Sequence, residues 1–93
     1  MKIQVNITHA NMTINETFNG KTAEEVVGAM KSRVAKELPF ALRLAANAMG
    51  NLMFAQEVVK RYNDSEKKNL DLPKSCDEFI TLAEEQGFAT KLE

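Results

Sequence analysis

The chain has few of the residues around which many small domains are built. Its 93 residues include one cysteine, two prolines, four glycines and no tryptophan. A single cysteine, Cys76, excludes an internal disulfide framework and any metal site that needs several thiolates. The glycines are scattered, so there is no glycine-rich phosphate loop. No His, Cys, Asp or Glu pattern has metal-ligand spacing, and we therefore expect neither a metal nor a cofactor.

The chain also has almost no net charge. Twelve basic and thirteen acidic side chains leave a formal charge of −1. Proteins that bind nucleic acid normally carry a basic surplus or a basic stripe, because phosphate contacts supply most of the affinity. Lys31, Arg33 and Lys36 cluster in sequence but have no aromatic residues between them. We therefore do not expect nucleic acid as the main partner, and the Lys31–Lys36 face is the only candidate surface for it.

The N-terminus lacks the continuous apolar segment of a signal peptide, because apolar and polar residues alternate there. We therefore expect a cytoplasmic protein. Hydrophobic residues make up 44% of the chain and charged residues 27%, which is typical of globular proteins. With 93 residues, the composition predicts a single small domain over 1–93.

The alternation predicts a two-stranded antiparallel β-hairpin, with strands over 2–8 and 12–18 and a four-residue loop between them. Ile3, Val5 and Ile7 share one face, which we expect to be buried. Matching the apolar faces predicts three cross-strand pairs: Ile7 with Met12, Val5 with Ile14, and Ile3 with Glu16. Glu16 would then lie on the apolar side, near the open end of the hairpin.

Three helices are expected after the hairpin. Thr22 with Glu25, and Ser75 with Glu78, are capping boxes that predict helix starts. The first helix, over 22–38, should cover the sheet and end at Pro39. A second helix is expected over 39–62, a polar connector over 63–74, a third helix over 75–86, and frayed residues at the C-terminus. The fold class is thus α+β with the order ββααα, and the sheet would have four strands only if two hairpins paired across a dimer.

Residues 38–56 carry a single formal charge, at Arg43, and this apolar stretch has three possible explanations. A membrane span is excluded because Asn, Gln and Arg side chains interrupt it. On a helix, its apolar residues cover about half the circumference, which is more than the stripe of a typical surface helix. The sequence therefore predicts the central helix of the domain, with one further face to be explained.

That further face suggests an interface with a second copy. Large apolar residues and two asparagines recur at intervals of three and four, close to the spacing of a coiled-coil seam. An antiparallel homodimer would place Asn51 of each copy at the crossing point. Alternatively, Phe40 and Phe54 are covered within one chain by the third helix or the connector. The candidate interface residues are Phe40, Leu44, Asn47, Asn51, Phe54, Val58 and Tyr62.

Catalytic residues are not evident. His9 is the only histidine and is expected in a solvated turn, while Cys76 is expected to be inert and partly buried. Catalysis would need a nucleophile or an acid–base pair within hydrogen-bond reach. Glu16 is the most unusual ionisable group, because it lies on an apolar strand face where a partner such as Arg43 would be expected.

The sequence favours a small cytoplasmic, non-enzymatic interaction or scaffold module that self-associates through the helix over 40–62. The first partner would be a second copy, and a further protein partner stays open. An alternative is a small-ligand binder or minor enzyme, with Glu16 and Arg43 in a cleft between the hairpin and the central helix. Nucleic-acid contact through the Lys31–Lys36 face is a third and weaker alternative.

Overall fold

The structure is a computed structural model that describes residues 1–9 and 12–92. Within them, the α+β class expected from the sequence is confirmed, with three strands and four helices. The elements in chain order are β1 (Lys2–His9), β2 (Met12–Asn19), α1 (Ala23–Ala35), α2 (Phe40–Ala48), α3 (Asn51–Glu66), α4 (Cys76–Glu85) and β3 (Ala89–Lys91).

The hairpin forms, but its register differs by two residues from the expected one. Ile3 lies opposite Phe18, and Val5 lies opposite Glu16. A shift of two residues keeps every side chain on its expected face, so the alternation could not distinguish the two registers. The observed register is the better one, because it pairs two buried apolar residues, Ile3 and Phe18. The expected four-residue loop is also wrong, since pairing continues to His9 and Met12.

The third strand was not expected, because the C-terminal residues were predicted to fray. β3 instead pairs antiparallel with the second edge of β1, giving the strand order β2-β1-β3. Gly87 has a φ of +84°, a conformation that glycine adopts readily, and it turns the chain back after α4. β3 thus covers the second edge of β1 from Ile3 to Val5 within one chain, whereas β2 stays at the edge of the sheet.

The helix expected over 39–62 is interrupted, and this expectation was wrong. α2 ends at Ala48, both Met49 and Gly50 are extended, and α3 begins at Asn51. Two contacts with α1 hold the break in place. The side chain of Asn51 donates to the backbone oxygen of Glu24, and the ammonium group of Lys31 donates to the backbone oxygen of Met49.

The other two helix predictions are largely confirmed. Thr22 and Ser75 cap α1 and α4 by accepting hydrogen bonds from the backbone N–H groups of Glu25 and Glu78. α1 is shorter than expected and ends at Ala35, before the proline. α3 continues to Glu66, past the expected start of the connector.

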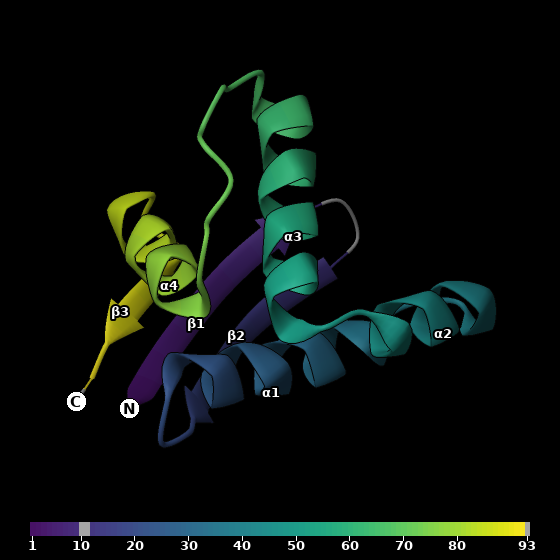
Figure 1. Cartoon of the computed structure of the whole chain (residues 1–93), viewed down its shortest axis with the longest axis horizontal. Coiled ribbons are helices and arrows are strands. Elements are labelled where there is room, and N and C mark those ends of the chain that lie inside the picture. The colour runs from purple at the N-terminus through teal and green to yellow at the C-terminus, as the bar shows by residue number, and fades with distance from the viewer. Residues whose placement is uncertain (10–11, 93) are drawn as a thin grey trace.

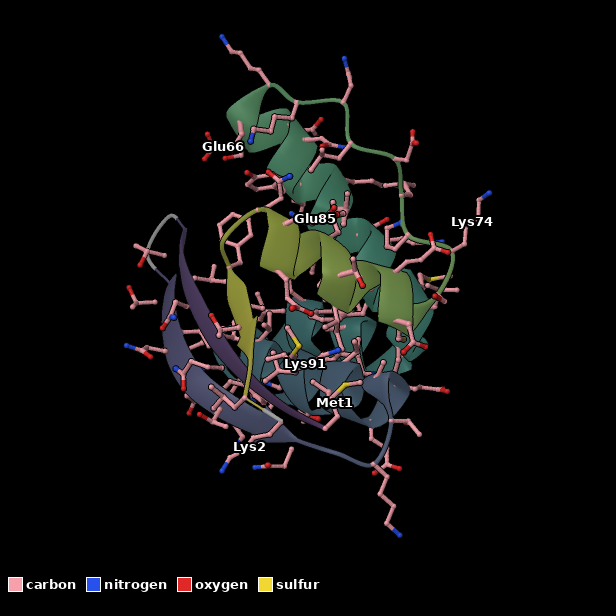
Figure 2. All side chains as sticks on the ribbon, turned by 90° about the vertical axis from the view of Figure 1, so that its left-hand side faces the viewer. Met1, Lys2, Glu66, Lys74, Glu85 and Lys91 are labelled. Carbon is pink, nitrogen blue, oxygen red and sulfur yellow. The ribbon has the colours of Figure 1, made fainter. Side chains whose placement is uncertain are left out.

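The molecule has two layers, with the strands on one side and the helices on the other (Figure 2). α1, α3 and α4 cover one face of the sheet and enclose a single core. α2 instead projects beyond α3, away from the sheet and from both termini (Figure 1). The core residues from the strands are Ile3, Val5, Ile14, Phe18 and Ala89, and those from the helices are Ala23, Val26, Val27, Met30, Phe54, Ala55, Val59, Cys76, Phe79 and Ile80.

Candidate functional site

The helix α2 is apolar but exposed. Its sequence is FALRLAANA, and Ala46 is its only buried residue. Phe40 is 72% exposed, Leu44 56% and Leu42 52%. A helix that is hydrophobic on most of its surface is normally buried, and contiguous apolar patches on soluble proteins often mark binding surfaces.

α2 lies against α1, and Ala46 is the buried residue of α2. Arg43 donates from Nε to the backbone oxygen of Ala35 at 3.2 Å and from Nη2 to that of Leu38 at 3.3 Å. These contacts leave the opposite side of α2 free. We call this side the outer face, and its residues are Phe40, Ala41, Leu44 and Ala48, all of them exposed.

The predicted seam is divided between two helices. Phe40, Leu44 and Asn47 lie exposed on α2, whereas Asn51, Phe54, Val58 and Tyr62 lie on α3. Because the helix is broken at residues 49 and 50, the seven residues do not form one continuous stripe.

The α3 members of this set face their own chain. Phe54 is 6% exposed and belongs to the core, so the alternative of burial within one chain holds for this residue. Asn51 bonds to α1, which takes it away from a crossing point between copies. The hydroxyl of Tyr62 bonds to Gln86, and its ring packs edge-on against Phe88 with centroids 4.9 Å apart.

The two polar residues of the predicted ligand cleft bind elsewhere. Glu16 forms an ion pair with Arg33 at 2.7 Å, and Arg33 also bonds to Glu37 at 2.6 Å. The bond to Glu37 and the charge of Glu16 raise the pKa of Arg33. Arg43 instead donates to the backbone oxygens of Ala35, the last residue of α1, and of Leu38, in the segment before α2. The sequence did indicate that Glu16 needed a cation, but not that α1 supplies it.

The Lys31–Lys36 face is not a row of free cations. Lys31 donates to the backbone oxygen of Met49 at 2.7 Å, and Arg33 is engaged by two carboxylates. Only Lys36 of this trio is exposed without a bond among the described residues. Lys31 and Arg33 therefore hold parts of the fold together, which leaves Lys36 of the three to contact a phosphate backbone.

Cys76 is the first residue of α4. Its thiol is buried, and burial raises its pKa, with the Glu24 and Asp77 carboxylates raising it further. A thiol with a raised pKa is protonated at neutral pH and is a poor nucleophile. The side chain of His9 lies outside the described part of the structure.

A cavity of about 210 Å³ lies between the sheet and the helices. It occupies the place expected for a ligand cleft, between the hairpin and α3, but its walls are apolar. Thr8, Arg61 and Glu66 are exposed at its rim, where it opens to solvent. The walls are formed by Val5, Ile7, Ile14, Phe18, Met30, Val34, Phe54, Val58, Tyr62, Phe79 and Phe88.

The aromatic residues are distributed unevenly. The chain has five phenylalanines and one tyrosine, and all of them except Phe40 line this cavity. Phe40 is the exposed aromatic residue of α2. The sequence predicted a cleft in this place but not its apolar lining, because strands, helices and a C-terminal turn, distant in the chain, supply the walls.

No group of three or more His, Cys, Asp or Glu residues within 1–9 and 12–92 could hold a metal ion. No helix in that part of the chain is long and apolar enough to cross a membrane. Comparisons with family models, curated proteins and solved structures give no significant match. The functional argument therefore rests on the geometry of the chain itself.

Proposed function

We propose that the protein is a small interaction module that self-associates through the outer face of α2. The observation that carries the proposal is the exposure of Phe40 and Leu44 on a helix with a single buried residue. Both side chains lie on the outer face, one helical turn apart, and neighbouring alanines allow a partner to approach closely. A central aromatic anchor of this kind is typical of the residues that dominate binding energy at protein interfaces.

The folding of the domain does not explain α2. The core is formed by the sheet, α1, α3 and α4, and no residue of α2 belongs to it. An isolated helix of nine residues is marginal in water, and α2 has no side-chain cap at its N-terminus. A second copy would remove Phe40 and Leu44 from water and stabilise the helix. The dimer expected from the sequence is thus retained, with its interface moved to α2.

The other two candidate functions have weaker support. Glu16 and Arg43 do not meet, so a ligand cleft would have to rely on the apolar cavity alone. Nucleic-acid binding would rely on Lys36, because Lys31 and Arg33 are engaged.

The test is the solution mass by light scattering on a sizing column, over a wide concentration range. We expect the wild type to have twice the 10.4 kDa of one chain. Phe40→Glu and Leu44→Glu should each have 10.4 kDa with an unchanged circular dichroism spectrum. Leu92→Glu is the matched control, because Leu92 is 50% exposed and follows β3, far from α2, and this variant should stay dimeric.

Two results would contradict the proposal. One is a wild type that is monomeric throughout the concentration range. The other is a dimer that survives both Phe40→Glu and Leu44→Glu, since the interface would then lie elsewhere.

A further inference from the structure

Two features of this chain match one another chemically. One is the cavity, which is open to solvent and lined by aromatic and aliphatic side chains. The other is Phe40, the aromatic residue that does not line it, which is 72% exposed at the start of α2. In an isolated chain, both the cavity walls and the ring of Phe40 leave apolar surface in contact with water, which is unfavourable in proportion to the area exposed.

We propose that the cavity of one copy receives Phe40 from the α2 helix of a second copy, and that the second copy receives Phe40 in return. This inference rests on the proposed self-association and specifies where α2 binds. Leu44, one turn further along the outer face, would pack at the cavity mouth.

The size and chemistry of the cavity suit a phenyl ring. An apolar cavity of about 150 Å³ in another protein is known to hold benzene. The cavity here is about 210 Å³, which leaves room for part of a second side chain. Phe18, Phe54 and Tyr62 offer ring edges and faces, and aromatic pairs gain about 0.5–1.5 kcal/mol beyond the area they bury. Arg61 and Glu66 provide the polar rim that surrounds the apolar centre of a typical interface.

The contacts of α2 favour a second copy as the source of this ring. Arg43 and Ala46 keep the opposite side of α2 on α1, so the outer face is directed outward from its own chain. Reciprocal insertion is also self-limiting. Each copy gives one helix and receives one, which produces a closed dimer with twofold symmetry, whereas one-way insertion would build open chains.

The area that two insertions would bury reaches the lower limit for a specific interface. A phenylalanine side chain buries about 150–250 Å². Each insertion also covers Leu44, the alanines beside it and the walls that receive them. Two insertions therefore remove on the order of 1,000 Å² from solvent, which is the lower limit for a specific interface.

The decisive experiment mixes two variants that each lack one half of the contact. Val58→Phe fills the cavity from α3 and keeps the outer face of α2 intact. Phe40→Glu keeps the cavity and loses the anchor. Each variant alone should be monomeric by light scattering. An equimolar mixture should form dimers, because one cavity and one Phe40 remain that fit together, with affinity at least about 30-fold below that of the wild type.

Fluorescence gives a direct readout of insertion. The chain has no tryptophan, so Phe40→Trp introduces a single reporter. Its emission should shift to shorter wavelength as the concentration rises and the dimer forms. The same substitution combined with Val58→Phe should show no such shift. Should Val58→Phe alter the circular dichroism spectrum, Val34→Phe fills the cavity from α1 and replaces it.

Several outcomes would overturn the inference. A cavity-filled variant that stays dimeric would show that α2 binds another surface, and the proposed self-association would survive. A mixture of Val58→Phe and Phe40→Glu that fails to dimerise would also contradict the insertion of Phe40 into the cavity. The dye 1-anilinonaphthalene-8-sulfonate is expected to bind the monomeric Phe40→Glu variant and to be excluded from the wild-type dimer. If the dye instead bound equally to both proteins, with one dye per chain, and did not bind Val58→Phe, the cavity would be a small-molecule site.

Discussion

α2 and α4 are helices of nearly the same length with opposite surroundings. α2 has nine residues and buries one of them, whereas α4 has ten and buries Cys76, Phe79 and Ile80. α4 is capped by Ser75 and carries two acidic residues in its first turn, where the helix dipole favours negative charge. α2 has neither feature. The apolar side chains of α4 are buried, whereas the apolar sequence of α2 is largely exposed, and such a disagreement between sequence and burial is expected at a functional surface.

The largest difference should appear when a carboxylate is placed on each side of the 49–50 break. Phe54→Glu puts an unpaired charge in the core, and we expect the chain to lose its folded circular dichroism spectrum at neutral pH. Phe40→Glu should fold normally, because that side chain is already in water. If both variants folded with equal stability, Phe54 would not be a core residue.

A smaller difference is expected for truncation to alanine. Phe79→Ala opens a cavity under α4 and should lower the free energy of unfolding by about 3–5 kcal/mol. Leu44→Ala should change it by less than about 0.5 kcal/mol at concentrations where the chain is monomeric. Urea unfolding of dilute samples measures both. A large effect of Leu44→Ala under these conditions would mean that α2 supports the monomer fold.

Changes to the N-terminal caps of α4 and α2 should also differ in their effect on the free energy of unfolding, on the scale of about 1 kcal/mol. Ser75→Ala removes the acceptor for the Glu78 N–H group and should lower the free energy of unfolding by about that amount. Pro39→Asp would supply α2 with the side-chain acceptor it lacks. We expect more helical signal at 222 nm in that variant but less than about 0.5 kcal/mol of change in unfolding, because α2 lies outside the core. A full 1 kcal/mol gain would contradict this separation.

The sequence predicted the features that depend on residues close together in the chain. Alternation placed both hairpin strands, and the capping boxes at Thr22 and Ser75 located two helix starts within a residue. Local patterns could not select the hairpin register, because a two-residue shift keeps every side chain on its face. They also missed β3, whose three residues are ordered by pairing with β1 rather than by their own propensity.

The candidate site was harder to predict because it also depends on contacts between distant parts of the chain. Phe40 and Leu44 were recognised as candidate interface residues from their spacing, and the structure leaves both exposed. The break after Ala48 depends on Asn51 and Lys31 bonding to groups on other elements, which spacing along one helix cannot show. The cavity needs five elements at once, so no stretch of sequence carries its signature.

The smallest expected effect concerns Cys76, at the buried start of α4, and it appears only at alkaline pH. Burial raises the pKa of this thiol in the folded chain, so the unfolded chain loses the proton first as pH rises. The contribution of the protonated thiol to stability is therefore complete at neutral pH and declines above about pH 8.5, the ordinary thiol value. The quantity to measure is the difference in stability between wild type and Cys76→Ala at each pH, because effects of pH that both chains share then cancel. In urea unfolding, the wild type should lose more stability than the variant between neutral and alkaline pH. Parallel pH profiles would mean that the thiol is as well solvated in the folded chain as in the unfolded one, and the burial contrast between α4 and α2 would then not extend to the first residue of α4.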